Sequence, residues 1–260
     1  MPASADVTAP SLDDAALRLE QRSGRIAAGA ALLAVLGNFV GLVLAASETT
    51  RVSVNGAAPA ARQQLRDVHA APGTEIAVAS VRAIAALLII PIALHLYTAT
   101  RARDEHASPR WVRVIGIAGP VLLAMATVLG YFALRGVARD FAVGADQSAA
   151  HAHALITGRF SLRASFWFER AAYLVFGTWT ALASLHAMRT GLLTRGIGIW
   201  GIAAGAVSAF LPVGAALFIG WLASVAVIAL GWWPGGLPPA WSEGRAIRWD
   251  DERRQPLSGR

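Results

Sequence analysis

The sequence predicts an all-α fold, an integral membrane helical bundle with six transmembrane helices and with five as the alternative. Hydrophobic residues make up 55% of the chain and charged residues 15%, against about 25% charged residues in soluble globular domains. Apolar runs of about 20 residues recur along the chain, and about 20 helical residues cross a bilayer core. Residues 196–242 contain no charged side chain.

The first four apolar runs follow a polar tail at residues 1–25. They predict transmembrane helices at residues 26–46, 76–98, 114–134 and 166–188. The first run is much longer than the roughly 7 to 15 apolar residues of a signal peptide. We therefore interpret it as an uncleaved span.

The uncharged stretch is too long for one crossing, and Pro212 lies where a break would divide it. We predict a fifth helix at residues 192–211 and a sixth at residues 213–233, because each half then has the length of one span. A kinked or re-entrant last segment would instead give five spans. The remaining residues, 234–260, form an Arg-rich tail.

The distribution of arginines predicts the orientation. With a cytoplasmic N-terminus, the inner segments hold 14 arginines, and the outer loops at residues 47–75 and 135–165 hold 7. Because cytoplasmic segments carry the excess of basic residues, we expect both termini in the cytoplasm. All 23 basic residues are arginine, and the chain is rich in alanine, which is typical of a GC-rich bacterial genome. We therefore expect the bacterial inner membrane.

Composition also excludes several kinds of chemistry. The chain has no cysteine, which excludes disulfides, thiolate nucleophiles and Cys-based zinc sites. It has no lysine either, which excludes Schiff-base catalysis and a Walker lysine. The net charge of +7 would suggest nucleic acid in a soluble protein, but here the arginines flank apolar spans. We expect no cofactor, no metal and no catalytic residue, and the lipid bilayer as the main partner.

Ionisable side chains inside predicted spans are the candidates for function, because a charge in the bilayer is costly. Arg82 lies near the outer end of the second span, and Glu169 and Arg170 lie at the outer start of the fourth. Arg82 and Glu169 have comparable depth, so they are expected either to form an interhelical ion pair or to hold a substrate or proton. His95 and His186 share a depth near the cytoplasmic side, where two imidazoles either share a proton, help to ligate a metal, or lie at the interface near the headgroups.

Two glycine pairs have the spacing of close helix packing. Gly37 and Gly41 lie in the first span, and Gly201 and Gly205 lie in the fifth. Glycines four residues apart let two helix backbones approach closely. The partner helix is expected in the same chain, in a homodimer or in another membrane protein.

Two segments carry a resemblance to known sequences. Residues 186–202, with the turn Arg189-Thr-Gly-Leu-Leu-Thr-Arg195, and residues 233–241, Trp-Pro-Gly-Gly-Leu-Pro-Pro-Ala-Trp, resemble uncharacterised actinobacterial multi-pass integral membrane proteins. The chain is also similar, more distantly, to a bacterial membrane family of unknown function, in which proline often precedes the second arginine of that turn and Thr194 stands here. The resemblance implies a multispan fold and no activity.

These observations predict a multi-pass membrane protein that is more an accessory or structural component than an enzyme. The alternative is a permease for a small solute or ion that uses Arg82 and Glu169. A membrane-embedded enzyme is the third interpretation, because the sequence offers no convergent set of catalytic groups.

Overall fold

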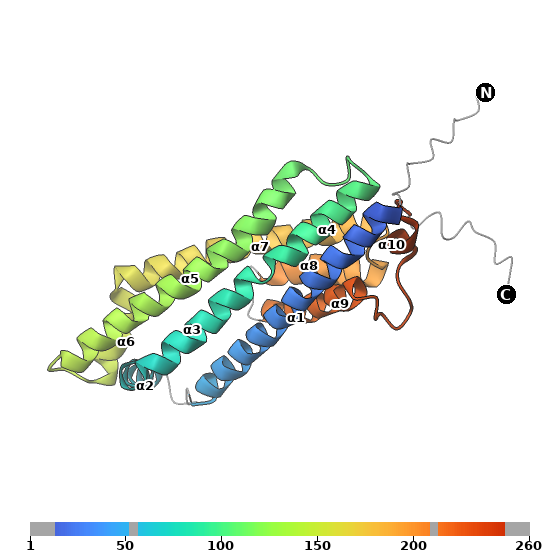
Figure 1. Ribbon diagram of the computed structural model, residues 1–260. Helices are drawn as coiled ribbons and strands as arrows, with labels where there is room; N and C mark the ends of the chain where they lie inside the picture. Colours follow the sequence, from blue (N-terminus) through green and yellow to red (C-terminus); the bar gives the residue numbers. More distant parts are fainter. Residues whose placement is uncertain (1–13, 52–56, 209–212, 248–260) are drawn as a thin grey trace, which may run out of the picture. The chain divides into compact units, whose positions relative to one another are not determined.

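The structure is a computed structural model that describes residues 14–51, 57–208 and 213–247 (Figure 1). All regular structure in these residues is α-helical, which confirms the predicted helical fold. The helices are α1 (Asp14–Arg51), α2 (Ala57–Ala70), α3 (Pro72–Leu87), α4 (Ile90–Arg103), α5 (Arg110–Val143), α6 (Ala149–Gly158), α7 (Phe160–Arg189), α8 (Arg195–Ser208), α9 (Val213–Ala229) and α10 (Pro239–Glu243).

Three helical segments in the described residues are long and apolar enough to cross a membrane. They are Ala15–Gly41, Pro72–Arg103 and Arg110–Val143, and the shorter segment Gly214–Ala229 is also apolar. The prediction of apolar membrane-type helices is therefore confirmed for these three segments by length and composition.

Proline breaks one predicted span and leaves another intact. Residues 88 and 89 form a turn between α3 and α4, so the predicted span 76–98 is built from two helices. Pro91 follows this turn, and a proline has no N–H to donate to the preceding turn of a helix. Pro120 lies inside α5 without ending it. Pro212, where we divided the last two spans, lies outside the described residues.

The chain divides into two compact units, to which α1, α5 and α7 each contribute a part. The first unit comprises Met1–Leu32, Ile90–Ile117 and Gly177–Arg260, and the second comprises Leu33–Ile89 and Ala118–Phe176. Each unit is described below by itself.

The second unit contains the two loops that the sequence analysis assigns to the outer side of the membrane. Helix α2 lies within predicted loop 47–75, and α6 lies within predicted loop 135–165. A buried apolar cluster joins these helices to the end of α5, with Leu65 and Ala152 fully buried and Phe141 1% exposed. Both connections therefore contain helices that share one core.

Small and large apolar residues occupy opposite faces of α1 and α3. On α1, Ala28 and Ala31 are fully buried, whereas the side chains of Leu33 and Leu36 are both 59% exposed. On α3, alanines are buried in the same way, and Ile84 is 57% exposed. Helices that meet through alanines approach closely, and the larger apolar side chains are left on the surface.

Candidate functional site

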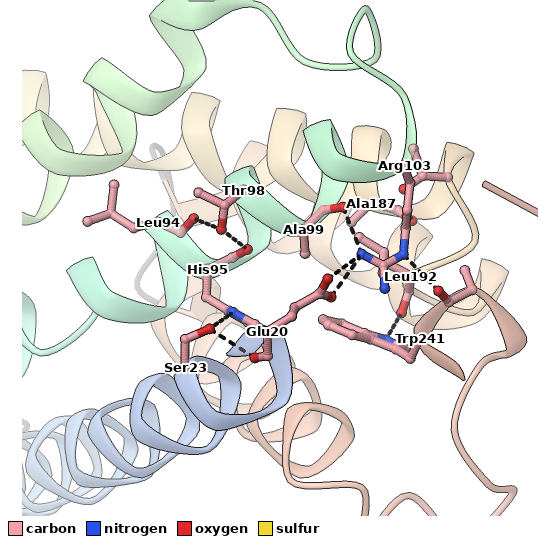
Figure 2. Close-up of polar contacts among 12 residues, drawn as sticks. Glu20, Ser23, Leu94, His95, Thr98, Ala99, Arg103, Ala187, Leu192 and Trp241 are labelled. Carbon is pink, nitrogen blue, oxygen red and sulfur yellow. Dashed lines mark hydrogen bonds and ion pairs between the residues drawn. The ribbon is translucent and has the colours of Figure 1, made fainter. Parts of the chain in front are cut away.

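The first unit contains a buried charged side chain, Arg103, in the last turn of α4. Arg103 is 3% exposed. A cation is favourable at the C-terminal end of a helix, and the position also puts Arg103 on the same face as Ala99 and His95, which precede it by four and eight residues. This stripe faces α1 and α10 (Figure 2).

The guanidinium of Arg103 is held by groups from three parts of the chain (Figure 2). Its Nη1 lies 2.8 Å from Glu20 Oε1 on α1 and donates to Glu20 Oε2 at 3.1 Å. The same nitrogen donates to the carbonyl oxygen of Ala99 at 2.9 Å, and Nε donates to that of Ala240 at 2.7 Å. The Arg103 Cζ also lies 5.1 Å from the centre of the Trp241 ring, within the range of a cation–π contact.

Trp241 connects this cluster to the turn after α7. Its ring stacks on His95, with ring centres 5.5 Å apart and planes inclined by 13°. Its Nε1 donates to the carbonyl oxygen of Leu192 at 2.9 Å (Figure 2). A few residues on, the Ile247 N–H donates to the carbonyl oxygen of Thr190 at 3.2 Å. The segment at residues 240–247 is thus fixed to α4 and to the turn at residues 190–193.

Gly191 is required where this segment approaches the turn. Its φ is +77°, a conformation that side chains with a Cβ rarely adopt. A Cβ at this position would also collide with the carbonyl oxygen of Ile247. The glycine therefore ends α7 and leaves room for the C-terminal segment.

Two buried nitrogen atoms of the cluster, His95 Nε2 and Arg103 Nη2, have no hydrogen-bond partner within the described residues. His95 Nδ1 lies 3.4 Å from Ser23 Oγ, and Nε2 points at the backbone of Gly24, where an added Cβ would lie 2.9 Å from it. The cluster therefore combines a buried ion pair with a histidine whose Nε2 is buried against α1. We call Glu20, His95, Arg103 and Trp241 the Arg103 cluster.

The structure does not bring the two candidate histidines together. His95 belongs to the Arg103 cluster, with Ser23 and Trp241 as its ring contacts. His186 is half-buried on α7, and its Nδ1 has no partner among the described residues. Across all the residues that the structure describes, no group of three or more His, Cys, Asp or Glu residues is placed to hold a metal ion.

Arg82, Glu169 and Arg170 meet around a residue that the sequence analysis did not single out. In the second unit, the side chain of Arg82 hydrogen-bonds with Tyr173, and Glu169 and Arg170 lie within electrostatic range of the same phenol. The Cζ of Arg170 lies 5.0 Å from the Phe166 ring centre. Among the described residues, no ion pair joins Arg82 to Glu169.

The four candidate glycines contact other helices of the same chain. An added Cβ on Gly37 would lie 2.8 Å from Ala85 Cβ, and one on Gly41 would lie 3.0 Å from Arg82 Cγ, so α1 packs on α3 in the second unit. In the first unit, a Cβ on Gly201 would collide with Ser184 and Trp221, and one on Gly205 with the carbonyl oxygen of Gly177. The absence of side-chain atoms at these four positions lets the helices approach.

Sequence comparison assigns the chain to a family. A sequence model of DUF4386, a domain of unknown function, matches residues 26–235. The chain belongs to the DUF4386 family. The expectation of a family of unknown function is thereby confirmed. No curated protein and no solved structure matches the chain.

The family match divides the Arg103 cluster. His95 and Arg103 lie inside the matched residues of the DUF4386 domain, whereas Glu20 precedes them and Ala240 and Trp241 follow them. The cluster is therefore made by the domain together with segments on both sides of it. Glu20, Arg103 and Trp241 were missed by the sequence analysis, because all three lie outside the predicted spans. The spacing of His95, Ala99 and Arg103 on one helix face was the available signal.

Proposed function

We propose that the chain is a six-span protein of the bacterial inner membrane, with both termini in the cytoplasm, that serves as a non-enzymatic structural or accessory component. The contacts of the Arg103 cluster are the main support for this topology. Glu20 precedes the first predicted span, Arg103 follows the second, and Trp241 follows the sixth. Arg103 contacts both Glu20 and Trp241. Residues in contact lie on one side of the bilayer, which supports an even number of spans between each pair.

The turn after the fourth predicted span also contacts the C-terminal segment that contains Trp241. Leu192 accepts from Trp241, and Thr190 accepts from Ile247. All the segments that arginine counting assigns to the cytoplasm therefore have a residue in this cluster or bonded to the segment that holds Trp241. In the five-span alternative, Trp241 would lie across the membrane from Glu20 and Arg103, so these contacts argue against it.

The surface of α1 and α3 supports the membrane location. Leu33, Leu36 and Ile84 are each more than half exposed, while the alanines beside them are buried. Large apolar side chains exposed in this way are an aggregation hazard in water. In lipid it is favourable, and small residues at the contacts are how membrane helices pack.

The arrangement of charge supports a structural role. Arg103 binds a carboxylate, two backbone carbonyl groups and an aromatic ring. A charged group with this many protein partners holds segments together, and its loss leaves several of those partners unpaired. We interpret the cluster as the group that fastens the cytoplasmic ends of the bundle.

The topology can be tested directly, because the chain has no cysteine. Single cysteines at Gln147, His106 and Ser242, all exposed, would be treated with a membrane-impermeant maleimide in intact spheroplasts. We expect Gln147→Cys to be labelled, and His106→Cys and Ser242→Cys to be labelled only after permeabilisation. Labelling of Ser242→Cys from outside would show that the C-terminal segment is not cytoplasmic and contradict the proposal.

The non-enzymatic role predicts a defined assembly. After purification in a mild detergent, we expect the tagged chain to retain either a second copy or one membrane partner at a fixed ratio, measured by native mass spectrometry with crosslinking in intact membranes beforehand. A monomer in both measurements would contradict an accessory role.

A permease is the second candidate, and the environment of Arg82 favours it. Arg82 is exposed, hydrogen-bonds with Tyr173 and is not neutralised by an ion pair with Glu169 in the described residues. We would reconstitute the chain in vesicles and measure light scattering under gradients of potassium chloride and of glycerol. A flux that Arg82→Gln abolishes and Arg66→Gln retains would favour the permease over the structural component.

A further inference from the structure

The second unit carries an open groove of about 650 Å³ between α5 and the start of α7. This volume lies in the range of small-molecule sites, roughly 300 to 1,000 Å³. On α5 the lining residues recur from Leu129 to Asp140 at helical spacing, and on α7 they recur from Ser161 to Phe168. The groove therefore lies between one face of each helix.

The two ends of the groove differ in chemistry. One end is lined by Leu129, Phe132 and Phe168. The other end has the ion pair between Asp140 and Arg159, with the Ser161 residue beside it. Leu129 and Asp140 are eleven residues apart, which is about 16 Å along a helix. The site is thus long, apolar over much of its length and charged at one end.

The predicted spans put this change in chemistry at the membrane surface. The third span ends at residue 134 and the fourth begins at residue 166, so the apolar end lies within both spans and the Asp140–Arg159 pair lies outside them. An amphiphile that lies along the groove would have its chain at bilayer depth and its headgroup in the interface. This step rests on the membrane location proposed above.

The ion pair also indicates the kind of headgroup. The side chains of Arg159 and Asp140 are 46% and 52% exposed, and a guanidinium has five N–H donors while a carboxylate has about four acceptor sites. Each group therefore keeps capacity for a further partner. Two adjacent groups of opposite charge complement a headgroup that carries a phosphate next to an ammonium. A headgroup with a phosphate and no cation would place a second negative charge beside the Asp140 carboxylate, which is unfavourable.

We propose that the groove lined by Leu129, Phe132, Gly136, Asp140, Arg159 and Phe168 binds one zwitterionic aminophospholipid. Its phosphate contacts Arg159, its ammonium contacts Asp140, and one acyl chain lies along α5. The lipid is a specifically bound partner of this chain, in addition to the bulk bilayer.

Two glycines of α5 provide a matched pair of variants. An added Cβ meets nothing within 4 Å at Gly136 or at Gly130, so each position accepts a larger side chain without a collision at its first atom. Gly136 lines the groove and Gly130 does not. Gly136→Leu should fill the groove, whereas Gly130→Leu changes the same helix outside it.

The test is native mass spectrometry of the delipidated full-length chain with added dioleoylphosphatidylethanolamine or dioleoylphosphatidylglycerol. We expect the wild type and Gly130→Leu to bind one phosphatidylethanolamine, and Gly136→Leu to lose at least fivefold in occupancy at equal thermal stability. We expect Asp140→Asn to abolish the preference over phosphatidylglycerol. The proposal is overturned if Gly136→Leu binds like Gly130→Leu, or if the wild type binds both lipids equally. The cysteine labelling above reads the membrane location independently, so failure of the lipid site is distinguishable from failure of the topology.

Discussion

The Arg103 guanidinium lies 5.1 Å from the centre of the Trp241 ring, although the two residues are 138 positions apart in the sequence. Arg103 ends α4 and Trp241 lies in α10. The contact joins a helix end near the middle of the chain to a segment beyond the last apolar helix. It makes the stability of the first unit sensitive to single side chains at both positions.

Removing the charge of Arg103 should destabilise the protein strongly. Arg103→Gln leaves the Glu20 carboxylate and the carbonyl oxygen of Ala240 without their partner. Removing one partner of a buried ion pair costs about 3 to 5 kcal/mol of stability, because the other charge stays buried without a partner. We expect a large drop in the thermal unfolding midpoint of the purified protein in detergent.

Arg101→Gln is the matched control for this change. Arg101 forms an ion pair at 3.6 Å with Glu105, whose side chain is 78% exposed, and exposed pairs contribute about 0 to 1 kcal/mol. A double variant, Glu20→Leu with Arg103→Met, should be more stable than Arg103→Gln, because no unpaired charge is left buried. Equal midpoints for Arg101→Gln and Arg103→Gln would refute a stabilising role for the pair.

Trp241 should hold the C-terminal segment through its indole N–H as well as its ring. Trp241→Phe keeps an aromatic ring against His95 and removes the donor to the Leu192 carbonyl oxygen, at a cost of about 1 kcal/mol. We expect faster tryptic cleavage after Arg245, measured by mass spectrometry of the fragments. Trp232→Phe is the control, since Trp232 is 71% exposed, and its cleavage rate should equal that of the wild type.

The close contact of α8 with α7 should not tolerate even one added methyl group at Gly205. A Cβ there would lie 2.8 Å from the backbone nitrogen of Ala181 and still closer to the carbonyl oxygen of Gly177. Because backbone atoms cannot move aside as a side chain can, we expect Gly205→Ala to destabilise the protein by about 1 to 3 kcal/mol. Gly196→Ala, on the same helix with nothing within 4 Å, should be neutral or slightly stabilising. A thermal melt of each variant decides this, and a neutral Gly205→Ala would show that the two helices can separate.

Acidic pH should loosen the start of α6 through Asp146. Hydrogen bonds from the backbone and side chain of Ser148 hold the pKa of Asp146 below its usual value of 3.8. Since the folded-state pKa is the lower one, the stabilisation is present above the usual value and is lost as the pH falls through the folded-state pKa. The protection factors of the amides at residues 148–152, which correct for the intrinsic exchange rate at each pH, should therefore fall in acid for the wild type. In Asp146→Asn the protection factors should already be lower at neutral pH and change little with acid.

The helical fold and its apolar helices could be predicted because both depend on local composition. A run such as residues 114–134 is apolar enough to be recognised without knowledge of its neighbours. The helix ends were harder to predict. The start of α1 at Asp14 and the end of α5 at Val143 lie in polar sequence, which hydropathy does not distinguish from a loop. Glu20 and Arg103 therefore lay outside the predicted spans.

The pairing of residues at the site could not be predicted for a geometric reason. Depth in the membrane follows from position along a span, and it was the only criterion that related His95 to His186. Contact also requires the two side chains to point at each other around their helix axes. His95 faces Ser23 and Trp241. These residues are far from His95 in the sequence, and no spacing or motif in the sequence relates them to it.

The position of Arg103 inside the DUF4386 match, with its partners outside that match, has a consequence for protein engineering. A fragment cut at residues 26 and 235 would keep the buried guanidinium and remove Glu20, Ala240 and Trp241, which supply its counter-charge, a carbonyl acceptor and its aromatic neighbour. Such a fragment would expose an unpaired cation at the end of α4. The smallest piece worth expressing therefore runs from Asp14, where α1 begins, to Ile247, whose N–H bonds to Thr190.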